Sequence, residues 1–564
     1  MILDARDIPA KTELKCEVVI VGAGAGGVTV ARELLDSSLD VILLESGGRR
    51  EEKDTQELYC GEVLDPGHHS ALHRHRRRRF GGTTTVWGGR CAPLDSVDFE
   101  TRSYVPYSGW PVSRNDLDQY YHRAHEHCEC GAYTYDAAEA LPNGQHPLIP
   151  GFQSSDFTQE RIWRFSLPTD FGKRCARAFE ESQRIRVYLH ANCLGIQTNS
   201  EGHQITGLRV ASLKRNEFVV RAKYYVIAAG CLETTRLLLV SRDVWPEGIG
   251  NQKGLVGRFY CGHFTGDLCT ATFTPKGGEV IWNYERSHEG VYCRRSITIC
   301  EETQRREGLM NFRVTLTHPP IPDVAHRNGI LSAAYLTKRF LIDKIPPEYS
   351  KVLAETKYQE VREHLKNIVL DMPNLAGFSV HWLRRRILAR RKLPSIAFKS
   401  PNNLYSLHFD AEQAPNPESG VMLGEERDVF GVPRLRVDWR GSDRDVESVL
   451  RSFALLKREF ERCGIGKINE PEQVVGERLR RQAGVGAHQF GTTRMAIDPS
   501  RGVVDANCRV HGTVNLFIST SSVFPTVGYA NPVLTITAFA IRLADHLKSL
   551  SRATIQELST SKSA

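Results

Sequence analysis

The residues best suited to catalysis stand near the C-terminal end, in the runs GAHQFGTTRM (486–495) and ANPVLT (530–535). The imidazole of His488 can take a proton at neutral pH, because an unperturbed histidine has a pKa of about 6.5. Asn531 is a preferred helix N-cap, and Pro532 is tolerated at a first helical position. Taken singly, Asn531 would only cap a helix and His488 would be a satisfied buried histidine. A catalytic role depends on the elements that bring them together.

A strand and a helix are expected to position this pair. Val514–Ile518 is a short apolar run between turn-rich flanks, which indicates a buried strand, and Ser519–Tyr529 indicates a loop. The following helix has apolar residues at helical spacing, namely Val533, Ile536, Ala540, Leu543, Ala544 and Leu547. Its first turn would direct free N–H groups and the positive end of the helix dipole beyond Asn531, which suits an anion or an electron-rich ring.

A dinucleotide site is predicted at the N-terminal end. The apolar run Glu17–Val21 leads into a G-x-G-x-x-G turn, a helical pattern and a second strand that ends at Glu45. Gly22 would make the tight turn, Gly24 would let the backbone approach a pyrophosphate, and Gly27 would allow close helix–strand packing. Glu45 can accept hydrogen bonds from ribose hydroxyls. This unit alone fits NAD and FAD equally.

A stretch rich in glycine and threonine, Arg79–Gly89, cannot form a packed element. A surface loop is the plain interpretation, but it does not explain Trp87 between small residues.

The runs around His488 and Asn531 resemble the C-terminal motif of the glucose-methanol-choline (GMC) flavin oxidoreductases, especially the pyranose-oxidase-like branch. There, a histidine in H-x-x-G-T-x-R-M pairs with the asparagine of A-N-P-x-L-T. The match is specific because it combines two motifs, their order and their separation. Ala496 departs from the usual glycine after Arg-Met, and we expect no catalytic consequence. The resemblance spans most of the chain and is weakest at about 130–185 and 270–405.

The resemblance implies FAD, because the Gly-Gly loop of the family runs along the flavin diphosphate and ring. The residues that it assigns to the cofactor are Gly22, Gly24, Gly27, Glu45, Gly81, Gly82, Thr85, Val86, Trp87, Gly88, Ala229 and Pro532. Arg78 or Arg79 could also meet the diphosphate, and a solvated charge run explains them equally well.

The same comparison predicts that the FAD is not covalently bound. Pyranose oxidases carry a histidine in this loop that bonds to the flavin 8α-methyl group, and Val86 stands in its place here. An alkyl side chain cannot form that bond. A displaced linkage through His73 or His75 is disfavoured, because the chain would have to reach across a turn.

The activity that the resemblance implies is oxidation of an alcohol to a carbonyl. His488 would take the hydroxyl proton while hydride passes to flavin N5, and Asn531 would hold the same hydroxyl. The branch favours a sugar or glycoside, with another cyclic or aliphatic alcohol, including a steroid-like one, as the alternative. Gln413 is a candidate substrate contact, although a structural role at a domain seam is favoured. A GMC-type lyase with non-redox flavin and a flavin-bound structural protein stay open, as does the electron acceptor, whether oxygen, a quinone, a cytochrome or a dye.

The predicted fold class is α/β, with a Rossmann-like FAD-binding domain and an inserted substrate domain of β-sheet plus helices, as in GMC and p-hydroxybenzoate-hydroxylase-like proteins. The FAD domain would comprise 1–261, with a connecting segment at about 100–185, and 476–548. The substrate domain would comprise 262–475, and 549–564 would be a flexible tail.

Local patterns predict further elements. A strand pair is expected at Val187–His190 and Gly195–Ile196, and a strand at Tyr224–Gly230 that opens a helix. Helices are expected at Ala334–Leu341 and Tyr349–Leu370.

Composition limits the remaining classes of function. The 564 residues are 41% hydrophobic and 25% charged, as in soluble proteins, and no apolar run reaches the roughly 18–20 residues that cross a bilayer. The N-terminal end lacks the apolar core of a signal peptide, so a cytoplasmic location is expected. The 14 cysteines have no framework spacing and Cys128-x-Cys130 does not match a zinc pattern, so we expect reduced thiols and no metal.

Basic residues cluster at His73–Arg79 and Leu383–Lys392, within a net charge of +8. No nucleic-acid motif accompanies them, so no nucleic-acid partner is expected. The segment Phe378–Lys392 is also apolar and could lie on an anionic membrane or a partner. A basic helix flank is the favoured interpretation, so a membrane partner is disfavoured, and an oligomer stays open.

Overall fold

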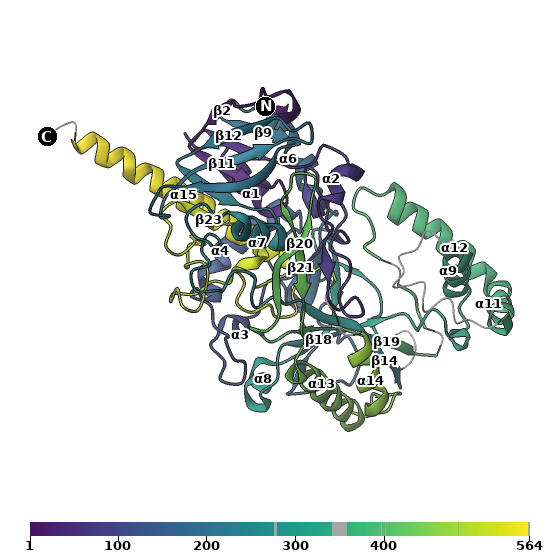
Figure 1. Cartoon of the computed structure of the whole chain (residues 1–564). Coiled ribbons are helices and arrows are strands. Elements are labelled where there is room, and N and C mark those ends of the chain that lie inside the picture. Colours follow the sequence, from purple (N-terminus) through teal and green to yellow (C-terminus); the bar gives the residue numbers. More distant parts are fainter. Residues whose placement is uncertain are drawn as a thin grey trace.

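The computed structural model describes residues 1–275, 279–340, 358–395, 397–400, 402–482, 484 and 486–561. Its two largest sheets have six strands each and lie in different parts of the molecule (Figure 1).

The first sheet is parallel and has six strands. Their order is β1 (Ile2–Asp4), β9 (Ile185–Leu189), β4 (Val41–Leu44), β3 (Val18–Val21), β13 (Tyr224–Ile227) and β23 (Leu516–Ile518). The central strands are continuously apolar and buried, as expected for a parallel sheet that is covered on both faces. The helices α1 (Ala25–Glu33), α4 (Arg114–Cys128) and α15 (Pro532–Ser561) pack together beside it. The predicted Rossmann-like fold is confirmed, and both ends of the chain contribute to it.

Two local expectations differ from this arrangement. β9 and β10 (Asn192–Thr198) do not pair with each other: β9 joins the parallel sheet, whereas β10 begins a sheet of order β10-β11-β12-β2. A turn at His190, with a positive φ of 58°, separates the two strands. The chain after Ser549, expected as a flexible tail, continues α15 to Ser561.

The second large sheet is antiparallel and also has six strands. Its order is β22 (Gly466–Ile468), β14 (His263–Phe273), β19 (Leu404–Glu412), β18 (Phe312–Thr317), β17 (Ile297–Ile299) and β7 (Phe157–Thr158). The helices α13 (Asp443–Arg462) and α14 (Glu472–Gln482) lie against it (Figure 1). β7 comes from the segment at about 100–185 that was predicted to be a connection, so this segment contributes an edge strand to the sheet. The exact domain boundaries stay a prediction.

An arm of helices projects from this sheet at the right of Figure 1. It comprises α9 (Gly329–Phe340), α11 (Tyr358–Leu370), α12 (Met372–Trp382) and a π-helical turn, η5 (Leu383–Leu388). The predicted helices at Ala334–Leu341 and Tyr349–Leu370 correspond to α9 and α11, and 341 and 349–357 lie outside the described residues.

Other described elements include β2 (Glu13–Lys15), α2 (Lys53–Glu57), β5 (Glu62–Val63), η2 (Gly82–Thr85), β6 (Arg90–Cys91), α3 (Ser96–Phe99), α5 (Ala137–Ala140), β8 (Ile162–Phe165), α6 (Phe171–Glu181), β11 (Ile205–Ala211), β12 (Glu217–Arg221), α7 (Cys231–Val240), β15 (Glu285–Arg286), β16 (Tyr292–Arg295), α8 (Glu301–Glu307), β20 (Gly420–Arg427) and β21 (Pro433–Asp438). None of the described helices has the length and hydropathy needed to cross a bilayer.

Candidate active site

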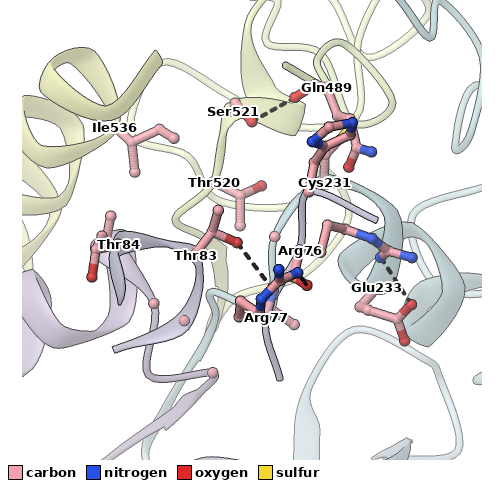
Figure 2. Close-up of a pocket in the computed structure, with 18 of the residues that line it drawn as sticks. Arg76, Arg77, Thr83, Thr84, Cys231, Glu233, Gln489, Thr520, Ser521 and Ile536 are labelled. Carbon is pink, nitrogen blue, oxygen red and sulfur yellow. Dashed lines mark hydrogen bonds and ion pairs between the residues drawn. The ribbon is translucent and has the colours of Figure 1, made fainter. Parts of the chain in front are cut away.

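One cavity of about 720 Å³ is lined both by the glycine turn after β3 and by His488 and Asn531. Its size falls within the range of small-molecule and cofactor sites. Figure 2 shows residues from three distant parts of the chain around this space, namely Thr83, Thr84, Cys231, Glu233, Thr520, Ser521 and Ile536. The fold therefore brings the two predicted sites together in one cavity.

The glycine turn is shaped to admit a ligand at Gly24. A Cβ atom on Gly22 would lie 2.6 Å from the carbonyl oxygen of Ala228, and one on Gly27 would lie 1.9 Å from that of Gly22. A Cβ atom on Gly24 would meet no described atom within 4 Å. Gly24 is also the N-cap of α1, whose free N–H groups suit a phosphate. The turn thus fits the diphosphate of a dinucleotide.

Glu45 lies at the end of β4 and lines the cavity. Its two carboxylate oxygens accept hydrogen bonds from the backbone N–H groups of Ala23 (2.9 Å) and Gly47 (2.8 Å). Burial raises the pKa of this carboxyl, and the two N–H donors act in the opposite direction. The fixed carboxylate retains lone pairs that can accept ribose hydroxyls.

Some residues of the loop Arg79–Gly89, which was predicted to contact the flavin, line the cavity, and others support it from outside. Of the loop residues predicted to contact the cofactor, those that line the cavity are Gly82, Val86, Trp87 and Gly88, and Ala229 and Pro532 line it from other segments. Gly27, Gly81 and Thr85 are not among the described lining residues. Thr85 donates to the carbonyl oxygen of Gly82 at 2.9 Å, and Gly81 donates its N–H to Ala23 at 2.9 Å. These three shape the site from behind.

Of the two arginines considered for the diphosphate, Arg78 lies at the cavity and Arg79 does not. Arg78 lines the cavity and donates to Glu233 at 2.8 Å, and Arg76 donates to the same carboxylate at 3.2 Å (Figure 2). Arg79 donates instead to the backbone of Arg49 near the surface. This part of the basic run is therefore a buried ion-pair cluster and not a solvated face.

His488 and Asn531 contact each other directly. The side-chain N–H of Asn531 donates to Nε2 of His488 at 3.0 Å. Asn531 stands immediately before α15, as expected, and Pro532 begins the helix. The pair was predicted from motifs 43 residues apart in sequence, and the fold places them in hydrogen-bond contact.

A second histidine, His263 at the start of β14, fixes the tautomer of His488. Its Nε2 lies 3.3 Å from the carbonyl oxygen of Val527, which can only accept, so this nitrogen carries the proton. In neutral His263, Nδ1 is then an acceptor, and it lies 2.9 Å from Nδ1 of His488. His488 therefore donates through Nδ1 and keeps a lone pair on Nε2. That lone pair faces Asn531 and the cavity.

His488 stays neutral over a wide pH range. Burial lowers its pKa to about 3, and His263 adds to the effect, while the carboxylate of Asp410 opposes it. The sequence interpretation used the ordinary histidine value of about 6.5. Desolvation in the cavity accounts for the difference, because burial disfavours the imidazolium form.

A polar wall of Arg90, Thr265, His408 and Asp410 lines the same cavity and was missed in the sequence. Thr265 donates to Asp410 at 3.1 Å, and Arg90 donates to the other carboxylate oxygen at 3.4 Å. Burial raises the pKa of Asp410, but the charges of Arg90 and His408 outweigh it and bring the pKa below its ordinary value. The sequence contained one indication of this wall: His408 and Asp410 are two residues apart in β19, a spacing that puts both side chains on the same face of a strand.

Gln413 is not among the described residues that line the cavity, and its contacts are those of the structural role that the sequence favoured over a substrate contact. Its side-chain oxygen accepts from the N–H of Gly262 (2.9 Å) and the indole of Trp439 (3.0 Å). Its amide N–H donates to the carbonyl oxygen of Arg440 at 3.1 Å. The residue is 1% exposed and joins strands at the seam of the two domains.

Comparison with known families agrees with both halves of the site. A family profile described as GMC oxidoreductase matches residues 415–540, which contain His488 and Asn531. The chain is a GMC oxidoreductase. A second profile, FAD dependent oxidoreductase, matches residues 17–247, which contain the glycine turn and Glu45. FAD is therefore the cofactor of this GMC oxidoreductase.

Characterised relatives cover nearly the whole chain at low identity. The 6'''-hydroxyparomomycin C oxidase of Streptomyces lividus is 23% identical over 96% of this chain and 93% of its own. Paromamine 6'-oxidase of Streptomyces fradiae is 22% identical over 94% of this chain and 90% of its own. The fructose dehydrogenase large subunit of Gluconobacter japonicus is 22% identical over 94% of this chain and 97% of its own. Among solved structures, pyridoxine 4-oxidase has a TM-score of 0.57 at 16% identity, covering 94% of this chain and 99% of that one, which shows the shared fold.

We expect the FAD of this GMC oxidoreductase to be released when the protein is precipitated with acid. Val86 lies in the cavity wall where a linking imidazole would be needed, and an alkyl group cannot form the bond. Absorbance of the supernatant measures the released flavin. His75 also lines the cavity, so a yellow washed pellet would contradict the expectation, and a colourless His75→Ala pellet would then locate the bond.

Proposed function

We propose that this protein oxidises a hydroxyl group of a sugar or glycoside to a carbonyl, with His488 as the base. The observation that carries the proposal is the pairing of His488 and Asn531 in a cavity whose described lining includes the polar wall of Arg90, Thr265, His408 and Asp410. The names of the relatives, a 6'''-hydroxyparomomycin C oxidase, a paromamine 6'-oxidase and a fructose dehydrogenase large subunit, support the same substrate class.

The proton transfer follows from the tautomer of His488. A substrate hydroxyl that enters the cavity donates to Nε2 of His488, which carries a lone pair. The side-chain N–H of Asn531 then turns from Nε2 to the substrate oxygen, at which negative charge develops. His263 accepts from Nδ1 of His488 throughout and keeps the imidazole in this orientation. FAD, when bound, supplies the two-electron acceptor for the hydride of the same carbon.

The cavity suits a polyhydroxylated ring better than a steroid-like alcohol. Asp410 is an ionised acceptor with Arg90 and Thr265 beside it, and vicinal hydroxyls can hydrogen-bond to such a group. Phe165 and Tyr284 also line the cavity, and their rings, 5.3 Å apart, offer an apolar face to the C–H side of a sugar. A steroid would bury apolar surface against the buried charges without satisfying them, which is unfavourable.

Asp410→Asn should raise KM for glycosides about tenfold to a hundredfold. A hydrogen bond to a charged group contributes roughly 1.5–3 kcal/mol, and asparagine keeps the shape but not the charge. The measurement is steady-state oxidation of a panel of monosaccharides and glycosides beside a sterol. Asp438→Asn, at a carboxylate paired with Arg440 outside the cavity, is the control. Unchanged KM in Asp410→Asn, or oxidation of the sterol alone, would contradict the substrate class.

His263→Leu should slow flavin reduction by roughly tenfold to a hundredfold, because it leaves the buried Nδ1–H of His488 without an acceptor, a loss of about 1–3 kcal/mol. His263→Asn keeps an acceptor near this position and should recover most of the rate. His263 also contributes to the low pKa of His488, so His263→Leu should move the acid limb of the reduction rate to higher pH. Equal loss in both variants, with an unmoved acid limb, would mean that His263 only supports the fold.

A further inference from the structure

The helical arm carries a concentration of large apolar side chains that the protein does not bury. α12 and η5 have no buried residue. Of the 17 large hydrophobic residues that are exposed on the described surface, eight lie in α11, α12 and η5: Leu365, Val369, Leu370, Met372, Val380, Leu383, Ile387 and Leu388. Scattered exposed apolar residues need no explanation, whereas a contiguous group marks an interaction surface.

The same stretch has a strong positive charge. Between Asp371 and Asp410 the sequence contains no acidic residue, and the cations at the end of the arm are Arg384, Arg385, Arg386, Arg390, Arg391 and Lys392. The ion pairs of the described residues that flank this stretch are Lys366–Glu363 and His408–Asp267, and none falls between them. Most of these cations therefore have no described carboxylate to neutralise them.

The basic end of the arm is attached beside the catalytic cavity. Arg391 donates to the backbone carbonyls of Phe165 at 2.9 Å and Glu129 at 3.1 Å. Phe165 lines the cavity, and so do Pro394 and Ser395, which follow the basic run directly. Whatever contacts this end of the arm lies close to the cavity rim.

We propose that α12 and η5 dock this protein on an anionic lipid surface, with the cavity rim held next to it. A short helix with exposed aliphatic residues and adjacent arginines has the chemistry of an interfacial helix, and anionic headgroups complement its charge. Trp382 is of the amphipathic type found at membrane interfaces; its ring is half-buried and stacks on that of Phe378, with centroids 5.9 Å apart. The sequence favoured a solvated basic flank; the exposure of the aliphatic side chains is what the structure adds.

A second copy of the chain fits this surface less well. A symmetric dimer would place the patch against itself, because a two-fold interface uses the same surface of both subunits. The basic clusters of both copies would then meet without acidic partners nearby, and like charges in close contact are repulsive.

The test is flotation of the FAD-loaded, full-length protein with vesicles of phosphatidylcholine alone or of phosphatidylcholine with phosphatidylglycerol. We expect binding to the anionic vesicles, at least tenfold weaker binding to the neutral ones, and release at about 1 M salt, where the Debye length is about 3 Å. The emission of Trp382 should shift to shorter wavelength on binding, and a Trp382→Phe variant identifies that signal.

Two sets of variants separate charge from apolar insertion. Arg384→Glu/Arg385→Glu/Arg390→Glu should lose about a hundredfold or more in partitioning, since each cation near an anionic surface contributes roughly fivefold. Ile387→Ser/Leu388→Ser should lose at least tenfold, even at low salt. The matched control, Lys173→Glu/Lys214→Glu/Lys253→Glu, makes the same change in net charge at exposed sites outside the arm and should bind as the unaltered protein does.

Equal flotation with both lipids, no flotation, or the same loss in the control variant would overturn the proposal. So would a dimer in lipid-free solution, measured by light scattering, that Ile387→Ser/Leu388→Ser dissociates, because the arm would then pair two chains. Flavin content and oxidation of a soluble glycoside should be unchanged in every variant, which shows that a loss of flotation is not a loss of fold.

Discussion

His488→Ala should slow reduction of the flavin by substrate about 10²–10⁴-fold, with little change in melting temperature. This is the usual contribution of a general base. His488 lines the cavity and presents the lone pair of Nε2 there, so alanine removes the proton acceptor. Rapid mixing under anaerobic conditions gives the rate, and thermal unfolding gives the stability.

Two further substitutions make this result specific. His511, whose Nε2 lies 3.0 Å from the carbonyl oxygen of Ala496, is not among the described cavity residues, so His511→Ala should reduce flavin at the normal rate. Asn531→Asp keeps a good N-cap but loses the N–H that donates to Nε2, so the rate should fall while the fold survives. If His488→Ala melts early yet reduces flavin normally once folded, His488 is a core residue and the assignment fails.

The second large effect is expected at the glycine turn. Gly24→Val should fold but purify colourless, because its side chain would occupy open space in the cavity where the diphosphate must approach. The backbone φ of −83° at Gly24 is accessible to valine. Flavin absorbance per protein gives the occupancy, and circular dichroism with thermal unfolding shows whether the fold is kept.

Gly27→Ala is the contrasting change at the same turn. Its Cβ atom would lie 1.9 Å from the carbonyl oxygen of Gly22, so the added methyl group disturbs the packing of α1 on β3. The variant should therefore unfold at a lower temperature. A yellow Gly24→Val protein with a full complement of flavin would contradict the position assigned to the diphosphate.

The pH dependence follows from the same geometry. With a pKa of about 3, His488 is already neutral at pH 5, whereas an ordinary histidine would be mostly protonated. In the unfolded chain it binds a proton with a pKa of about 6.5, so its burial destabilises the fold progressively as pH falls from 6.5 towards 3.

Local sequence was sufficient for the elements that carry the chemistry. The turn after β3 and the start of α15 are set by residues next to each other in the chain, through glycine geometry, an N-cap and a proline at the first helical position. The contact between His488 and Asn531 was predictable only through the family resemblance, because no local rule relates residues that far apart.

The polar wall and His263 could not be found in the same way. Thr265 and Asp410 become neighbours through the register of β14 and β19, which pairs residues 145 positions apart. His263 acts through a hydrogen bond to a ring 225 positions away. Gln413 shows the limit of a family-like run: the sequence offered a substrate contact or a structural role, and the contacts within the protein are those of the structural role, which was favoured.

The most direct test of the proposed reaction is anaerobic addition of sugars and glycosides to the FAD-loaded protein, read as the absorbance of the oxidised flavin. An oxidoreductase with His488 as its base should lose this absorbance with at least one sugar or glycoside, and the His488→Ala protein should lose it orders of magnitude more slowly. An absorbance unchanged by every sugar, glycoside, sterol and simple alcohol would contradict alcohol oxidation and favour a non-redox flavin, as in a lyase.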